Sequence, residues 1–216
     1  MKLEERVNAI SALGDYLKEL DEDTKSGLFL RAANENPWFT KESLHLAWQG
    51  ILNFLSKEKL TQWTSAYAFT DGKPKKVGLV MAGNIPMVGF HDLLSVIVAG
   101  HKALVKTSSQ DSALILFIIN SLNEIQPALG GQVAVVDRLN AMEAVIATGS
   151  DNSSRYFDYY FSKVPNIIRK NRSSCAIISG EESPEELLAL GDDLFSYFGL
   201  GCRNVSKLYV PTGYAL

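Results

Sequence analysis

The chain has 216 residues, of which 46% are hydrophobic and 21% charged, with 21 Lys and Arg against 24 Asp and Glu. This composition is typical of a globular domain and excludes an intrinsically disordered chain, while a net charge of −3 without a basic block argues against a nucleic-acid-binding surface. The longest nearly apolar run, residues 113–119, is far shorter than the roughly 20 residues that a bilayer requires, and charged residues stand where a signal peptide would begin, so a cytoplasmic location is the default expectation.

The first third of the chain has a helical pattern. Between residues 3 and 20, apolar side chains recur at steps of three and four residues, which predicts an amphipathic helix. Thr40 can cap a second helix with one apolar face, and the segment 34–37 separates the two. We therefore expect a helical N-terminal segment, residues 1–70, whose apolar stripes face a core or an interface.

The pattern changes at a turn signal, Asp71–Pro74, after which short apolar runs alternate with helical stretches. The predicted strands are 77–81, 103–106, 133–136 and 144–147. The predicted helices are 88–99, a helix capped by Ser108 or Ser109 that runs to residue 122, and 151–162. Strands that are apolar throughout and separated by helices predict an α/β fold with a parallel sheet covered on both faces. Such sheets bind ligands at the carboxyl ends of their strands, here the loops 82–86, 106–109 and 148–152.

A second domain is expected to begin after residue 174. The pattern restarts with a strand at 176–178, a helix at 184–198 and a strand at 207–211. Residues 175–216 are too few to build an independent core, so this second domain is expected to be incomplete.

Cys202 is the strongest candidate for a catalytic side chain. It lies in a glycine-flanked loop beside Arg203, whose guanidinium would favour the thiolate form. The alternative is a small buried hydrophobic residue. Cys175 lies within an apolar strand and is expected to be inert. The three histidines have no metal-ligand spacing, so no metal site is expected.

Three of the loops that follow strands carry polar candidates. Gly149 and Ser150 follow Thr148 at the start of a helix, where free N–H groups suit a phosphate, although the sequence alone favours an ordinary serine cap. Lys106 ends a strand and could reach a ribose or a phosphate, or could simply be solvated. Asn84 offers an amide donor in a loop fixed by proline, or could be a turn residue.

The order of these motifs carries more information than any one of them. The sequence resembles the aldehyde dehydrogenase superfamily at four motifs, in this order: Ala82–Pro86, His101–Lys106, Ala147–Ser150 and Gly201–Cys202. It is more narrowly similar to the LuxC-type acyl-CoA reductases, the fatty acyl reductases of bacterial luminescence, in three segments: Gly83–Phe90, Gly100–Ser108 and Phe198–Pro211. The resemblance extends over roughly residues 75–211.

The resemblance implies a Rossmann-like domain for a nicotinamide cofactor at 71–174, followed by the start of a catalytic domain at 175–216. In this family Cys202 would be the nucleophile that attacks a fatty acyl thioester and expels CoA or another thiol carrier. Asn84 would be the oxyanion donor, acting together with the backbone N–H of Cys202.

The resemblance also implies the cofactor contacts. Lys106 would contact the adenosine ribose, and the turn Thr148–Ser150 would contact the pyrophosphate. NAD-preferring aldehyde dehydrogenases commonly carry a Glu where this chain has Ser109. A carboxylate would repel a 2′-phosphate and a hydroxyl would not, so Lys106 with Ser108 and Ser109 favours NADPH.

One departure from the superfamily bears on the reaction. Hydrolytic aldehyde dehydrogenases have a general-base Glu where this chain has no carboxylate, in residues 170–174. Without that base, water is poorly activated to attack an acyl-cysteine. We therefore expect NADPH-dependent reduction of a fatty acyl-CoA, or another acyl thioester, to the aldehyde.

Three alternatives stay open at this stage: an acyl-phosphate reductase of the same superfamily, a non-catalytic nucleotide-binding module, and acyl transfer without a redox step. The sequence does not decide the acyl chain length, whether CoA or a carrier protein is the donor, or whether the chain forms a homo-oligomer.

Overall fold

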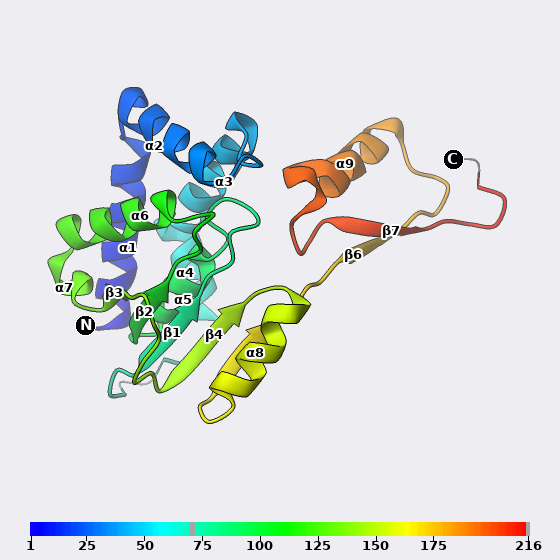
Figure 1. Ribbon diagram of the computed structural model, residues 1–216. Helices are drawn as coiled ribbons and strands as arrows, with labels where there is room; N and C mark the ends of the chain where they lie inside the picture. Colours follow the sequence, from blue (N-terminus) through cyan, green and yellow to red (C-terminus); the bar gives the residue numbers. More distant parts are fainter. Residues whose placement is uncertain (70–71, 215–216) are drawn as a thin grey trace. The chain divides into compact units, whose positions relative to one another are not determined.

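The computed structural model describes residues 1–69 and 72–214 (Figure 1). The turn predicted at 71–74 begins at Asp71, which lies outside the described residues. The chain divides into two compact units, Met1–Lys170 and Asn171–Leu216. The boundary predicted after residue 174 lies four residues beyond this division.

Within the described residues, five parallel strands form the sheet of the first unit in the order β3-β2-β1-β4-β5. Their bounds are β1 Lys76–Val80, β2 Lys102–Lys106, β3 Val133–Val135, β4 Ala144–Thr148 and β5 Asn166–Arg169. The α/β fold with a parallel sheet flanked by helices is thereby confirmed. β5, an edge strand of the sheet, was not predicted, because its sequence has only two apolar residues, Ile167 and Ile168, between polar ones.

Helices cover different parts of the two faces of the sheet. They are α5 Phe90–Val98, α6 Ala113–Ile125, α7 Pro127–Gly130 and α8 Asp151–Phe161. Because parallel crossovers are right-handed, α5 and α6 lie on one face and α8, which joins β4 to β5, lies on the other. α5 ends as predicted at a glycine, Gly100, whose φ of +80° is the left-handed conformation that terminates helices.

In the described part of the chain, four further helices precede the sheet: α1 Leu3–Lys18, α2 Glu22–Glu35, α3 Lys41–Phe54 and α4 Lys57–Ser65. The two predicted helices correspond to α1 and α3, and Thr40 caps α3 by accepting a hydrogen bond from Ser43 N–H at 3.2 Å. α2 and α4 were not predicted. Helix α1 packs against α5 and α6, and α2 packs against α6, so these helices belong to the same unit as the sheet.

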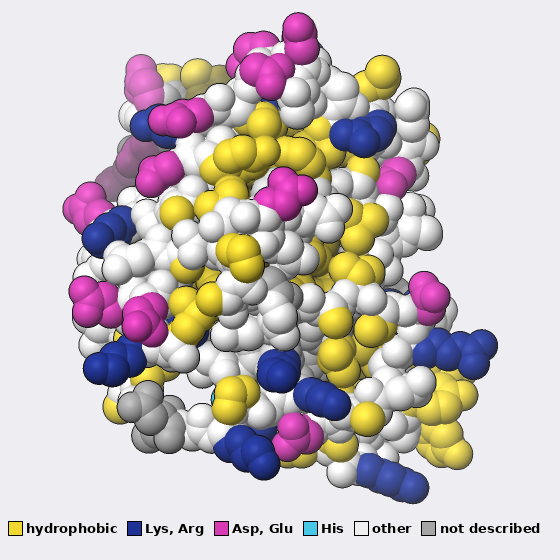
Figure 2. Space-filling model, turned by 90° about the vertical axis from the view of Figure 1, so that its left-hand side faces the viewer, with side chains coloured by type: hydrophobic (Ala, Val, Ile, Leu, Met, Phe, Trp, Pro, Cys, Tyr) yellow, Lys and Arg dark blue, Asp and Glu magenta, His cyan; other side chains and the backbone are white. Residues whose placement is uncertain are grey.

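The surface on the left-hand side of Figure 1, where α1, α2, α6 and α7 lie, is seen in Figure 2. Lys and Arg side chains are scattered there among Asp and Glu instead of gathering into one basic surface. Among the described residues, no helix is both long and apolar enough to cross a bilayer.

The start of α6 corrects one prediction. Ser108 and Ser109 do not cap this helix, which begins at Ala113. The acceptor comes instead from α2, because the Glu35 carboxylate accepts hydrogen bonds from Ser112 N–H at 2.7 Å and Ala113 N–H at 3.0 Å. A carboxylate at this position also interacts favourably with the positive end of the helix dipole.

The second unit is small. It contains β6 Ser174–Ile177, α9 Pro184–Phe195, a 3₁₀ turn at Ser196–Gly199 and β7 Val205–Tyr209, and β6 pairs with β7 in parallel. A capping box of Ser183 and Glu186 starts α9. The helix predicted to run to residue 198 ends at Phe195, because Tyr197 and Phe198 have φ values of +52° and +57°.

Candidate functional site

The candidate site of the first unit lies at the carboxyl edge of the sheet. β1 has β2 on one side and β4 on the other, with Val80 in register with both Lys106 and Ala147. The chain order reverses at β1, which is the position where open parallel sheets bind ligands. The loops that follow β1, β2 and β4 therefore lie at one edge, and they carry the predicted residues.

Asn84 lies in the loop 81–89 that follows β1. Its side chain is exposed, whereas Gly83 and Met87 on either side of it are buried. A Cβ at Gly83 would lie 2.5 Å from Ser108 Oγ, so only glycine allows this loop to pack on the loop after β2. The two loops are also joined by a hydrogen bond from Met81 N–H to Lys106 O at 3.1 Å. Asn84 is thus presented to solvent from a closely packed loop.

The loop after β2 presents Lys106 and Ser109 to solvent. The Lys106 ammonium donates a hydrogen bond to the backbone carbonyl of Asp137 at 3.1 Å, a contact from the loop after β3 that no sequence signal indicated. Ser108 is half-buried beneath Gly83, and its hydroxyl accepts a hydrogen bond from Gln110 N–H at 3.2 Å. Ser109 is therefore the more accessible of the two hydroxyls.

The turn after β4 opens α8. Ser150 is exposed, and its hydroxyl accepts a hydrogen bond from Ser153 N–H at 3.3 Å, so the serine is a helix cap. A Cβ at Gly149 would lie 2.9 Å from the Phe157 ring, which makes glycine necessary for this tight turn. The Thr148 hydroxyl is enclosed and has no hydrogen-bond partner in the described part of the chain, so a ligand could not reach it without a local change.

The donors at this edge fit a dinucleotide. An exposed ammonium at the end of β2 suits a phosphate or ribose oxygen, and the exposed Ser109 hydroxyl stands near it in the sequence. Ser150 opens a helix of eleven residues, whose first N–H groups and dipole suit a pyrophosphate. Lys106, Ser109 and the Gly149–Ser150 backbone are the groups that could hold such a cofactor.

Cys202 belongs to the second unit and is exposed, which excludes the alternative of a buried hydrophobic cysteine. The loop that carries it is held by Asn204, whose Oδ1 accepts a hydrogen bond from Gly201 N–H at 2.8 Å. Asn204 Nδ2 donates to the carbonyls of Asp193 at 2.9 Å and Ser196 at 3.0 Å. Cys175, expected within an apolar strand, lies on β6 and is also exposed.

Sequence reasoning missed four polar residues near the carboxyl edge. Arg169, the last residue of β5, forms an ion pair with the buried Asp92 in the first turn of α5. Asn36 and Asp111 contact the loop 81–89 and are buried. None of these residues directly follows a predicted strand, and the partner in each case is distant in the chain.

The carboxyl of Asp111 is unusual in its electrostatics. Burial raises its pKa to about 7, the hydrogen bond from Met87 N–H opposes this, and the nearby Glu35 carboxylate adds to the rise. The pKa of the Glu35 carboxyl is shifted in the opposite direction. Burial also acts to raise its pKa, but hydrogen bonds from Ser112 and Ala113 hold it below the ordinary value.

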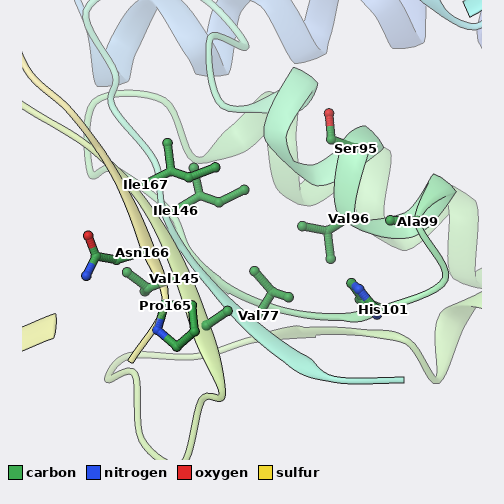
Figure 3. Close-up of a pocket in the computed structure, with 11 residues that line it drawn as sticks. Val77, Ser95, Val96, Ala99, His101, Val145, Ile146, Pro165, Asn166 and Ile167 are labelled. Carbon is green, nitrogen blue, oxygen red and sulfur yellow. The ribbon is translucent and has the colours of Figure 1, made fainter. Parts of the chain in front are cut away.

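A cavity of about 310 Å³ lies elsewhere, on the α5 face of the sheet (Figure 3). Val77, Ile146 and Ile167 line it from β1, β4 and β5, and Val96 lines it from α5. Val77 stands at the beginning of its strand and not at the carboxyl edge, and the lining is largely apolar. The cavity is therefore separate from the loops that carry the predicted site.

A family comparison identifies the chain. The sequence model of the acyl-CoA reductase (LuxC) family matches residues 38–189, which is more than half of the chain. The chain belongs to the LuxC acyl-CoA reductase family. The matched range of this LuxC-family chain includes the loops of Asn84, Lys106 and Ser150, and it ends before Cys202.

Solved structures with the same fold are aldehyde dehydrogenases. An NAD-dependent enzyme from Sinorhizobium meliloti is 15% identical with a TM-score of 0.75, and covers 99% of this chain and 47% of its own. The aldehyde dehydrogenase from Bartonella henselae is 15% identical with a TM-score of 0.72, and the match covers 98% of this chain and 49% of that enzyme. An NAD⁺ complex of the Bacillus cereus aldehyde dehydrogenase is 16% identical with a TM-score of 0.68, and the match covers 98% of this chain and 48% of that enzyme.

The LuxC-family chain thus spans about half the length of these structures, and at such identities the likeness shows the fold alone. No curated protein matches the chain.

Proposed function

We propose that the protein carrying this chain is an NADPH-dependent reductase that converts a fatty acyl-CoA, or another fatty acyl thioester, to the aldehyde through an acyl-cysteine at Cys202. The observation that carries the proposal is the meeting of three loops, those of Asn84, Lys106 and Ser150, at one edge of the sheet. The family match and the exposed Cys202 support the same chemistry.

Cys202 would act as the nucleophile. Its thiolate sulfur forms a bond to the thioester carbonyl carbon, and the carbon–sulfur bond to CoA breaks. CoA leaves as the thiolate, which takes a proton from solvent, and the acyl group stays on the enzyme. The carbonyl oxygen carries negative charge during this step. The Asn84 amide, exposed at the tip of an otherwise packed loop, would donate a hydrogen bond to that oxygen.

The cofactor would be held by the exposed groups of the sheet edge. The Lys106 ammonium, oriented by the Asp137 carbonyl, would contact the ribose, and the start of α8 at Ser150 would face the pyrophosphate. When bound, reduced nicotinamide supplies the hydride that converts the acyl group to the aldehyde. Ser109 favours NADPH over NADH, because it places no carboxylate beside a 2′-phosphate.

The segment between the units supports reduction over hydrolysis. Residues 170–174 contain two basic and no acidic side chains, so they supply no general base to activate water. An acyl-cysteine without such a base persists until a thiol or a hydride reaches it.

The test is the mass of the intact protein after incubation with a fatty acyl-CoA. We expect one acyl adduct that maps to Cys202 and is absent from C202A, and NADPH should then release the aldehyde. C175A is the matched control, because Cys175 is also exposed in the same unit and should be dispensable. If the adduct forms only from an acyl phosphate, the substrate is an acyl phosphate and not an acyl-CoA. If no adduct forms at Cys202, the proposed mechanism is wrong.

A further inference from the structure

Two buried side chains from outside the sheet edge hold the loop 81–89 on either side of Asn84. Asn36, which is 4% exposed and ends α2, donates a hydrogen bond from Nδ2 to Gly83 O at 3.0 Å. Its Oδ1 accepts a hydrogen bond from Trp38 N–H at 3.0 Å, so both ends of the amide are engaged. Asp111, 2% exposed, accepts a hydrogen bond from Met87 N–H at Oδ2, 2.8 Å away.

The loop backbone needs this support. Met87 has a φ of +57°, a left-handed conformation that a non-glycine side chain adopts at an energetic cost. Residues kept in such conformations are held by their surroundings, and the Asp111 carboxyl supplies the acceptor for the Met87 N–H. Gly83 is confined from the other side by Ser108.

We propose that Asn36 and Asp111 are positioning residues that fix the Asn84 amide where the acyl oxygen develops its charge. This rests on the proposed function. Neither residue touches the substrate; each acts through the backbone of the loop. The helical N-terminal segment then contributes to catalysis through Asn36, although it carries no reacting group.

Asp111 also makes the loop sensitive to pH. The charged group that faces it from a packed element is Glu35 of α2, and Asp111 Oδ1 has no hydrogen-bond partner among the described residues. Ionisation therefore places an unpaired charge in a buried site beside another carboxylate. Because burial brings the pKa of Asp111 to about 7, the loop should loosen as pH rises through neutrality.

Two measurements on the protein test the proposal: amide exchange at Met87 and its neighbours, and the rate at which a fatty acyl-CoA acylates Cys202. We expect N36A and D111A to exchange at least about tenfold faster in this loop and to acylate roughly tenfold more slowly or worse, with NADPH binding retained. D111N keeps an acceptor for Met87 but cannot ionise. If loosening of the loop slows acylation of wild type above pH 7, as we expect, D111N should not show that pH-dependent loss.

T64V is the matched control, because Thr64 is a buried residue that donates a hydrogen bond to Leu60 O at 2.8 Å within α4, away from the loop. If T64V slows acylation as much as N36A does, or if loop exchange in N36A and D111N equals that of wild type at every pH, the proposal is overturned. Wild type that does not acylate at all refutes the proposed function instead, and the exchange data then still decide whether the two residues hold the loop. Should D111A fail to fold, N36A and D111N decide the outcome.

Discussion

The two units of the chain are stabilised by different means. The first unit has a dense apolar core in which Ile115, Leu79 and many others are almost completely buried. In the second unit Ile178 is the buried apolar side chain among the described residues, and α9 buries none of its own. The second unit is held instead by helix caps and by the hydrogen bonds of Asn204. Packing therefore fixes the carboxyl edge of the five-stranded sheet, whereas local hydrogen bonds fix the Cys202 loop.

The largest expected difference between the two units is the loss of unfolding free energy when one leucine or isoleucine side chain is replaced by alanine. I115A removes a side chain that is 0% exposed in α6 and should cost about 2–5 kcal/mol of unfolding free energy, because it leaves a cavity. L188A removes one that is 75% exposed in α9 and should change stability by no more than about 0.5 kcal/mol. Chemical denaturation of both variants measures this. Equal losses would mean that the second unit has a core of its own.

Two carboxyl groups should respond to pH in opposite ways. The folded-state pKa of Asp111 is raised from 3.8 to about 7, so its contribution to stability is full below pH 3.8 and is lost as pH rises through about 7. Each unit of such a shift corresponds to about 1.4 kcal/mol. D111N should therefore gain stability relative to wild type between pH 4 and pH 8. A constant difference over that range would contradict the assignment.

Glu182 in the second unit behaves in the reverse sense. The hydrogen bond from Ser179 N–H, with further ones from the Ser179 hydroxyl and Gly180 N–H, lowers its pKa from 4.5 to about 2. The stability that this turn contributes is present above pH 4.5 and is lost as pH falls through about 2. NMR titration of the two carboxyl groups should give well-separated midpoints, with Glu182 the lower.

Removing the Asn204 side chain tests how the second unit holds its cysteine. N204A deletes the hydrogen bonds to Gly201, Asp193 and Ser196 and should cost about 1–3 kcal/mol, because three part-buried hydrogen bonds are lost. The reactivity of Cys202 toward a thiol probe should change, while that of Cys175 stays the same. Unchanged reactivity at Cys202 would show that the loop has another support.

The smallest expected effect concerns cofactor choice at the sheet edge. S109E places a carboxylate three residues after Lys106. In the proposed cofactor site it would repel a 2′-phosphate and accept hydrogen bonds from ribose hydroxyls. We expect the ratio of NADPH to NADH affinity to fall by about tenfold, which corresponds to about 1.4 kcal/mol. S150A, at the other end of the site, should weaken both cofactors alike. An unchanged ratio of NADPH to NADH affinity would show that the residue at position 109 does not determine cofactor preference.

The sequence predicts those parts of the fold in which a local pattern decides the structure. β1 is apolar after Lys76 and β4 is apolar before Thr148, and Thr40 and Gly100 act at helix ends through local contacts. β5 was missed because an edge strand needs few apolar residues. The start of α6 was misplaced because its acceptor, Glu35, lies 77 residues earlier than Ser112.

The residues of the candidate site also differ in whether the local sequence can identify them. Asn84, Lys106 and Ser150 could be named because each follows a strand in a recognisable order, and parallel strands bring such loops to one edge. Asn36 and Asp111 could not, because their role depends on burial and on partners 47 and 24 residues away. A polar residue next to a helix end has the same local signature whether it is solvated or holds a loop.

The contact between Gly83 and Ser108 limits how this protein can be redesigned. Because Ser108 fills the space where a side chain at position 83 would stand, position 83 does not tolerate a larger residue unless the two loops shift apart. Position 109 is free of that constraint and open to solvent. Under the proposed function, cofactor preference could therefore be changed at position 109 without disturbing the packed contact between the loops after β1 and β2.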